Sequence, residues 1–206
     1  MKRTPSLKVH VGGMVSTNGY LFDTGSEYYV IDAPKGMFDF VKSEGITPKA
    51  VLLTHQHYDH VEDASLFSKA GYPVYAYEAY SEELNILKQA SRWGMMVNVA
   101  PYHVTNETKG SDSLQIGDDE VKLLHIPGHS PDSIAFHFPQ TNVVFSGDTL
   151  FCGGLGRTDL PLSDDTLLVP AIKKHLLTLE DEVMVFPGHG GQTTIGEERV
   201  NNFGLR

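Results

Sequence analysis

One short stretch, THQHYDH at residues 54–60, constrains this chain more than any other. It follows the apolar run AVLL at residues 50–53, which predicts a buried strand. Three histidines and an aspartate within six residues are donors that suit zinc, iron or manganese. His55 and His57 are two residues apart, so an extended chain places both on one side, whereas a helical zinc motif would space them four apart. The stretch therefore predicts a metal site in a loop at a strand end.

Three later apolar runs, 121–126, 143–145 and 183–186, each lead into a glycine followed by another potential metal donor. The glycine–donor pairs are Gly128-His129, Gly147-Asp148 and Gly188-His189. A glycine at such a point frees the backbone to turn sharply and bring the next side chain inward. Three such turns after the first stretch indicate one shared site, since chance turns would not repeat the pattern in order.

The periodicity of apolar residues predicts strands followed by helices in each half of the chain. Expected strands cover residues 7–11, 18–22, 28–31, 50–53, 73–77, 114–117, 121–126, 134–138, 143–145 and 183–186. Expected helices cover residues 38–44, 62–70, 78–92, 163–177 and 195–202. This pattern predicts an α+β fold with two sheets packed face to face and helices outside. No linker composition interrupts the chain, so we expect a single domain over residues 1–206.

Composition narrows the compartment and the partners. The formal net charge of −10 argues against nucleic acid as a partner. The single cysteine, Cys152, excludes an internal disulfide and fits a reducing compartment, where we expect it to be a small buried thiol. No apolar run has the length of a membrane span. We therefore expect a cytoplasmic protein without a membrane or nucleic-acid partner, while the sequence leaves the oligomeric state undetermined.

The donor series HxHxDH, followed by His129, Asp148 and His189, resembles that of the metallo-β-lactamase-fold hydrolases, in particular the short glyoxalase II-like (hydroxyacylglutathione hydrolase) type. The resemblance implies an αββα sandwich of two mixed sheets with two divalent metal ions between them. Zinc is the expected ion, and iron and manganese accept the same ligands. The resemblance assigns one metal to His55, His57 and His129, the other to Asp59, His60 and His189, and makes Asp148 the bridge.

The same resemblance implies a reaction. Two cations that share one water lower its pKa from about 15.7 to about 7, so a metal-bridging hydroxide exists at neutral pH. That hydroxide would attack the carbonyl of a small-molecule thioester such as S-lactoylglutathione, with Asp59 as the catalytic residue that orients it. No side-chain nucleophile is needed in this scheme.

Two further segments bear on the substrate. The glycine-rich loop at residues 153–159 resembles the GxGR-type loop of short glyoxalase II-like enzymes, and the match makes Arg157 a candidate for binding a substrate carboxylate. A surface salt bridge is the alternative role for Arg157. The segment TTIGEER at residues 193–199 also resembles that group. Glu62 and Asp63 replace the usual glycine pair, and we expect them to cap the following helix and to add negative charge near the metals.

Other activities remain open at this point. A mono-iron persulfide dioxygenase would share the loop GRTD at residues 156–159 and hold one iron through His55, His57 and either Asp148 or His129. A lactonase or another esterase of the same fold is a further alternative. Metal stoichiometry and oxygen uptake distinguish the dioxygenase from a hydrolase.

Overall fold

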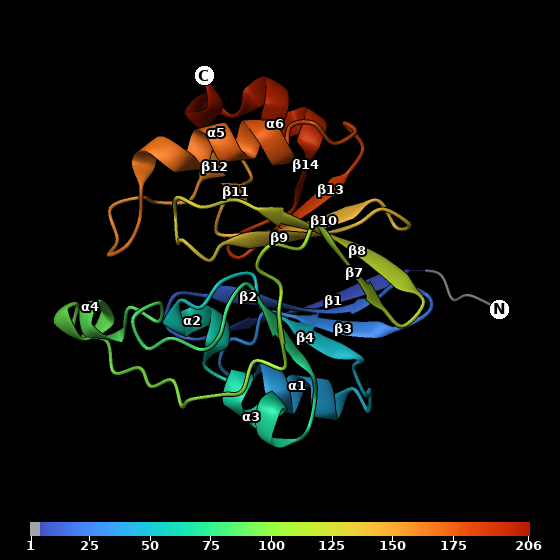
Figure 1. The fold of residues 1–206 in the computed structure, drawn as a ribbon, viewed down its shortest axis with the longest axis vertical. Helices are drawn as coiled ribbons and strands as arrows, with labels where there is room; N and C mark the ends of the chain where they lie inside the picture. The colour runs from blue at the N-terminus through green and yellow to red at the C-terminus, as the bar shows by residue number, and fades with distance from the viewer. Residues whose placement is uncertain (1–4) are drawn as a thin grey trace.

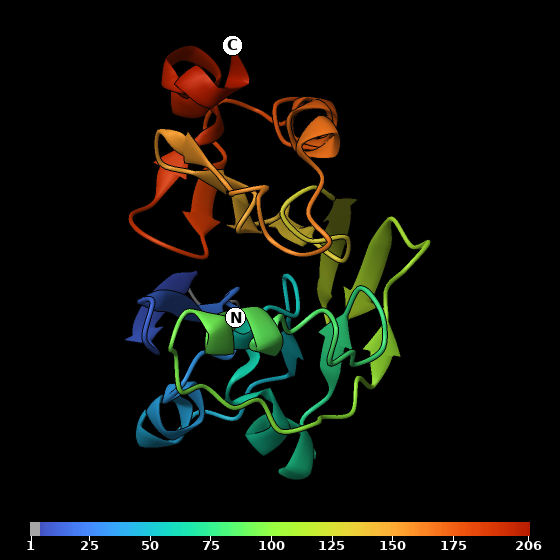
Figure 2. The same ribbon diagram turned by 90° about the vertical axis from the view of Figure 1, so that its left-hand side faces the viewer.

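The computed structural model describes residues 5–206, which stack in four layers (Figure 1). Two six-stranded sheets face each other in the middle. The helices α1 (Met37–Ser43) and α3 (Ala64–Lys69) cover the outer face of one sheet, and α5 (Asp165–His175) and α6 (Ile195–Asn201) cover the other. Figure 2 shows the same order of layers from the side. The predicted αββα sandwich is confirmed.

The first sheet is built by the N-terminal half of the chain. Its strands follow chain order: β1 (Ser6–Gly12), β2 (Thr17–Asp23), β3 (Tyr28–Ile31), β4 (Ala50–Leu52), β5 (Val74–Ala76) and β6 (Asn106–Glu107). The first three strands pair antiparallel and the last four pair parallel, so the sheet is mixed. In this sheet β4 lies beside β3, with the stretch THQHYDH directly after it.

The second sheet is built by the C-terminal half. Its spatial order is β14 (Thr193–Thr194), β13 (Met184–Pro187), β10 (Val143–Gly147), β9 (Ile134–Phe138), β8 (Asp119–His125) and β7 (Ser113–Ile116). Only the β10–β13 pair is parallel. Their carboxyl ends therefore meet at one edge, where Asp148 and His189 follow.

Three apolar layers hold the four structural layers together, because alternate residues of a strand point to opposite faces of its sheet. In β3, Tyr29 and Ile31 pack between the two sheets while Val30 packs toward the helices. In β10, Phe145 packs between the sheets and Val144 toward α5. Central strands buried on both faces explain why these segments read as continuous apolar runs.

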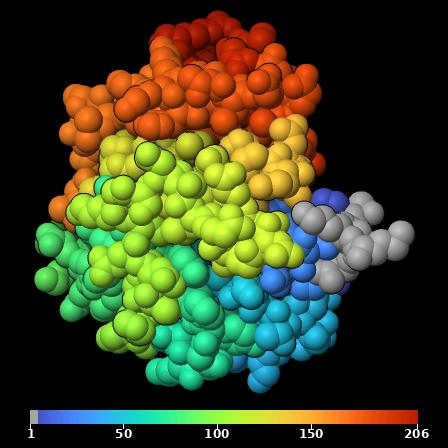
Figure 3. All heavy atoms as spheres, turned by 45° about the vertical axis from the view of Figure 1, so that its right-hand side comes forward, coloured from blue at the N-terminus to red at the C-terminus, as the bar shows by residue number. Residues whose placement is uncertain are grey.

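The space-filling view shows the same division on the surface (Figure 3). The N-terminal part, coloured blue to green, forms one end of the molecule, and the orange and red C-terminal part forms the other. Among the described residues, no helix combines the length and apolar character that crossing a membrane requires.

A predicted loop and a predicted helix are wrong in part. Residues 58–61 form α2 (Tyr58–Val61), so Asp59 and His60 stand on a helix and not in the expected loop, while the helix expected over 62–70 forms as α3. The helix expected over 78–92 is only α4 (Leu87–Arg92). The reason is that Gln56 bonds the preceding backbone: its side-chain amide donates to the carbonyls of Glu78 and Ala79 at 3.3 and 3.0 Å, which withdraws them from a helical ladder.

The expected cap at Asp63 also forms differently. Asp63 is the N-cap residue of α3, yet its carboxylate makes no capping bond there. It accepts instead from the Phe38 backbone N–H at 3.0 Å, in the first turn of α1. The carboxylate therefore satisfies a free N–H of a neighbouring helix and ties α1 to α3.

A buried hydroxyl links the two sheets. The Tyr29 Oη lies 2.7 Å from the Ile116 carbonyl and 3.0 Å from the Asp119 carboxylate of the facing sheet. Tyr29 is fully buried, and burial together with the Asp119 charge raises the pKa of its phenol far above the usual value. The hydroxyl is therefore a neutral donor across the central layer.

We predict that Tyr29→Phe lowers the free energy of unfolding by about 1–3 kcal/mol, because it leaves buried acceptors without this donor. Urea denaturation measures the change. The matched control is Tyr75→Phe on the same sheet, whose hydroxyl has no hydrogen-bond partner within residues 5–206 and whose loss should cost less than about 0.5 kcal/mol. Equal unfolding midpoints for the two variants would show that the hydroxyl does not link the sheets.

Candidate metal centre

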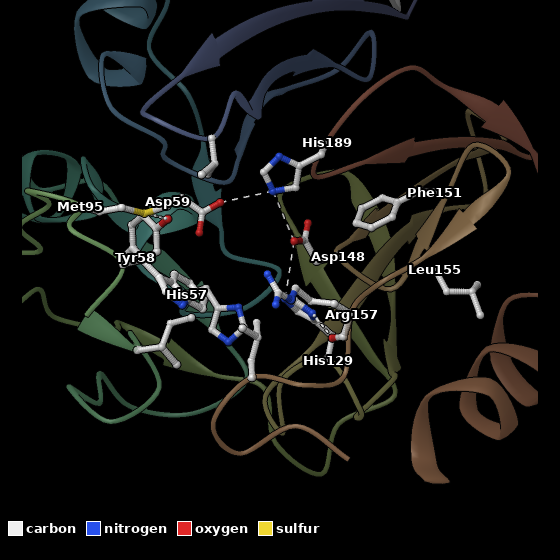
Figure 4. Close-up of a pocket in the computed structure, with 14 residues that line it drawn as sticks. His57, Tyr58, Asp59, Met95, His129, Asp148, Phe151, Leu155, Arg157 and His189 are labelled. Atoms are coloured by element: carbon white, nitrogen blue, oxygen red, sulfur yellow. Dashed lines mark hydrogen bonds and ion pairs between the residues drawn. The ribbon is translucent and has the colours of Figure 1, made fainter. Parts of the chain in front are cut away.

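The seven predicted donors converge at one edge of the sandwich, although they come from both sheets. Figure 4 shows the five of them that line the cavity. The first sheet supplies those that follow β4, and the second supplies those that follow β8, β10 and β13. Two sets have donor atoms within 4.8 Å of one another and match the predicted division: His55, His57 and His129, and Asp59, His60 and His189. A third set joins His55 and His60 to Asp148.

Asp148 lies between the two sets. Its Oδ1 is 3.3 Å from the His60 Nε2, and its Oδ2 is 3.5 Å from the His129 Nε2 and 3.3 Å from the His189 Nε2. Figure 4 shows the carboxylate between His189 and His129. Asp148 therefore contacts histidines of both sets, as a bridging carboxylate must.

The buried atoms facing the centre lack hydrogen-bond partners. Within residues 5–206, the Nε2 atoms of His55, His60 and His129 and Oδ1 of Asp148 make no hydrogen bond, although three of these atoms lie 3.3–3.5 Å from an oppositely charged atom of the cluster. Buried polar groups are normally paired, so four unpaired atoms at one point require another partner. Imidazole nitrogens and a carboxylate oxygen are the donors that zinc, iron and manganese prefer. The residues present fit a pair of divalent cations.

The opposite ring nitrogen of several histidines is held by the protein. The Nδ1 atoms of His55, His60 and His129 lie 3.1, 2.8 and 2.8 Å from the Thr54 hydroxyl, the Asp32 carboxylate and the Arg157 carbonyl. The Thr17 hydroxyl donates to Asp59 at 2.6 Å. Such contacts fix the orientation of each ring and leave Nε2 directed at the centre.

Asp32 is a site residue that sequence reasoning missed. It is buried, has φ of 57°, and accepts from the Thr54 backbone N–H and hydroxyl at 2.7 and 2.8 Å besides contacting His60. The signal was present: Asp32 directly follows β3, the parallel neighbour of β4, and carboxyl ends of parallel strands meet at one edge.

Gln56 was also missed, since it stands between two histidines and carries no donor that a metal favours. Its backbone N–H donates to Asp132 at 3.0 Å and its carbonyl accepts from the Asn85 amide at 2.6 Å. With its side-chain bonds to the 78–81 segment, Gln56 uses every polar group it has to hold the loop that presents His55 and His57.

The pKa values of the donors are shifted in two directions, downward where burial dominates and upward where a histidine faces carboxylates. Burial lowers the pKa of His57 to about 3 and that of His55 well below its usual value. Burial also acts to lower the pKa of His189, but Asp148 and Asp59 outweigh it and raise that pKa to about 10. Despite burial, neighbouring histidines hold the pKa of Asp59 at about 2. The proton on His189 thus balances the negative charge of Asp59 and Asp148. A metal cation would replace such protons, so metal binding should strengthen as pH rises.

A cavity of about 480 Å³ adjoins these side chains. Its lining includes five of the seven donors together with apolar side chains from both halves of the chain. Figure 4 shows Tyr58 and Met95 on one side of the donors and Phe151 and Leu155 on the other. A substrate in this cavity therefore contacts both the donor cluster and carbon surface.

Comparison with known proteins identifies the family of this chain. The model of the Metallo-beta-lactamase superfamily matches residues 13–189. The chain belongs to this superfamily. The match ends at His189, the last of the seven donors.

Two relatives show the range of activities among similar members of the superfamily. "Probable metallo-hydrolase YqgX" of Bacillus subtilis is 35% identical over 187 residues, which cover 88% of this chain and 84% of the relative. "Hydroxyacylglutathione hydrolase GloC" of Haemophilus influenzae is 32% identical over 190 residues, which cover 90% and 86%. The chain is thus similar to metallo-hydrolases along most of its length.

Two solved structures share the whole fold. The BLEG-1 B3 metallo-beta-lactamase has a TM-score of 0.87 at 32% identity and covers 97% of this chain and 99% of its own. TTHA1623, solved in a di-iron-bound form, has a TM-score of 0.83 at 36% identity and covers 95% and 98%. Similar folds thus belong to a β-lactamase and to a protein solved with two irons bound.

Arg157 lines the cavity, but its guanidinium already has a partner. It forms a bidentate ion pair with Asp159, with N···O distances of 2.6 and 2.7 Å, and lies 5.5 Å from the centre of the Trp93 ring. Both residues of the ion pair are more than half exposed, so the pair is weak and open to exchange. The surface salt bridge that was the alternative role for Arg157 is therefore present, and it lies beside the cavity.

The C-terminal segment TTIGEER holds part of the cavity wall. The hairpin of β11 (Leu150–Phe151) and β12 (Gly154–Leu155) carries Cys152 and Gly153 at its turn. Buried Glu198 accepts from the Gly153 N–H at 3.0 Å and from the Thr193 hydroxyl at 2.7 Å. Cys152 is exposed in this turn, which corrects the expectation of a buried thiol.

Gly188 gives a direct test of the close packing in this superfamily site. A Cβ at this position would lie 2.1 Å from Asp148 Oδ1 and 2.6 Å from His60 Cε1. We predict that Gly188→Ala weakens zinc binding by about 10- to 100-fold, the range seen when groups that orient ligands are disturbed. Competition with a chelator measures the affinity, and circular dichroism checks folding.

The matched control is Gly191→Ala, three residues away, where a Cβ has no heavy atom within 4 Å. It should bind zinc as the wild type does. If both alanine variants keep wild-type affinity, Gly188 does not shape the site.

Proposed function

We propose that this protein is a metal-dependent hydrolase that cleaves a thioester such as S-lactoylglutathione. The observation that carries the proposal is the cluster of seven donors, six of them buried, with Asp148 between its two sets, beside a cavity of about 480 Å³. The similarity to a hydroxyacylglutathione hydrolase over 90% of the chain supports the choice of a thioester. The proposal includes a cytoplasmic location and a small-molecule substrate.

In this proposal His55, His57 and His129 would hold one divalent cation, Asp59, His60 and His189 would hold the other, and Asp148 would contact both. Seven donors favour a catalytic centre, because a structural zinc site is usually closed by four. Zinc is the proposed ion. Iron is the alternative that a relative solved with two irons supports.

When bound, the cations supply Lewis acidity that makes hydroxide available at neutral pH and polarises the substrate carbonyl. The side chains of this chain do the positioning. Asp59, fixed by the Thr17 hydroxyl at 2.6 Å, accepts a hydrogen bond from the attacking water and orients it. Asp32 holds the His60 ring at 2.8 Å, so that the donor set keeps one geometry through the reaction.

Arg157 contributes to substrate binding in this scheme. Its guanidinium exchanges the exposed Asp159 carboxylate for a carboxylate of the thiol portion of the substrate. We predict that Arg157→Ala raises KM for S-lactoylglutathione by about 10-fold, the loss of one charge-assisted pair, with kcat little changed. Steady-state kinetics with a neutral thioester as the comparison substrate should show no such rise. An equal rise for both substrates would remove Arg157 from substrate recognition.

The function is tested by following thioester cleavage in the zinc-loaded protein. We expect S-lactoylglutathione to be hydrolysed, activity to vanish with a chelator and return with zinc, and His57→Ala to abolish it in a folded protein. The exposed His103→Ala serves as the control and should retain activity. Cleavage that persists in chelator or in His57→Ala would contradict the proposal.

Assays of oxygen uptake and of ester cleavage on the same protein distinguish the competing activities. Oxygen uptake with glutathione persulfide, without thioester cleavage, would assign it to a mono-iron dioxygenase. Cleavage of lactones or other esters in preference to thioesters would make it a different esterase of the same superfamily.

A further inference from the structure

One wall of the cavity is not used by the proposed reaction. We call it the apolar wall, and it consists of Tyr58, Ile86, Trp93, Met95 and Leu160. Tyr58 and Ile86 are 3% and 6% exposed, whereas Trp93 is 43% exposed. The wall therefore runs from the buried neighbour of His57 outward to solvent.

The wall offers carbon surface without a free charge. The Tyr58 hydroxyl donates to the Met95 sulfur, a weak acceptor, at 3.1 Å. Because this donor already has a partner, the pair does not require a polar group from a ligand. Among the residues that line the cavity, Arg157 carries the permanent positive charge; its guanidinium lies over Trp93 and is paired with Asp159. A ligand group on this wall gains by burying apolar area.

Ile86 is held in the wall against its backbone preference. Its φ of 50° lies in the left-handed region, where a β-branched side chain is a rare outlier. The preceding residue, Asn85, is fixed by two hydrogen bonds. Its side-chain amide donates to the Gln56 carbonyl at 2.6 Å, and its backbone carbonyl accepts from the Tyr58 N–H at 3.2 Å. Such strain persists where surrounding contacts impose it, commonly at ligand sites.

We propose that the apolar wall is a subsite for the acyl group of the substrate, and that it takes an aliphatic chain longer than the lactoyl group. The inference rests on the proposed thioester hydrolysis. A glutathione-type thiol carries carboxylates, and these belong at the exposed rim with Arg157. The acyl group is bonded directly to the scissile carbon, so it is the part that reaches the buried surface of Tyr58 and Ile86 beside His57.

The test uses S-methyl, S-butyl and S-hexyl thioethers of glutathione, which place an alkyl chain where the acyl group would lie and cannot be hydrolysed. Trp93 is the only tryptophan of the chain, so its fluorescence reports binding at the wall. For the zinc-loaded wild type, we expect affinity to rise about three- to four-fold per added methylene, which corresponds to about 0.8 kcal/mol.

Matched variants locate the effect. Met95→Ser and, from another segment, Leu160→Ser should flatten the dependence on chain length. Met96→Ser should keep it, because Met96 is 96% exposed and does not line the cavity. Affinity independent of chain length in the wild type, or equal slopes in Met95→Ser, Leu160→Ser and Met96→Ser, would overturn the inference.

The outcome is separable from that of the proposed function. The free acids butyrate, hexanoate and octanoate, the products of acyl thioester cleavage, should show the same dependence on chain length even if glutathione is the wrong thiol. Chain-length dependence without cleavage of any thioester would refute the proposed function and support the subsite. Cleavage without chain-length dependence in either series would do the reverse.

Discussion

The structure depends on one buried carboxylate, Asp148, placed between histidines from both sheets. Burying a carboxylate is unfavourable unless opposite charges or donors surround it. His60 comes from the first sheet, and His129 and His189 come from the second, so these neighbours assemble only when the two sheets are packed face to face. The aromatic layer between the sheets therefore holds the site together as well as the fold.

A second group of residues holds the metal donors in place by hydrogen bonds and does not belong to the seven donors. Asp32 fixes Thr54 and His60, Gln56 fixes the loop around both neighbouring histidines, and the Arg157 carbonyl fixes His129. The same bonds shape the cavity, because Gln56 also determines where residues 78–86 run and so where Ile86 lies. Donor geometry and substrate surface are thus set by one hydrogen-bond network.

The sequence predicted the sandwich, most strands and the convergence of the seven donors, because strand alternation and glycine–donor turns are local signals. It could not predict that Asp59 and His60 stand on α2, or that residues 78–86 are not helical, because the bonds of Gln56 and Asn85 are made between distant segments. The cap by Asp63 on α1 and the exposure of Cys152 depend on tertiary packing in the same way. The single domain, the metal ligation and the cytoplasmic location stay predictions.

The measurement that tests the central claim most directly is the number of cations per chain. Protein purified with zinc and dialysed free of excess metal is analysed for its elements, alongside Asp148→Asn. We expect two zinc ions per wild-type chain and one or none in the variant, because Asp148 joins the two donor sets. One cation per wild-type chain at saturation, or two retained in Asp148→Asn, would contradict a bridged pair at this site.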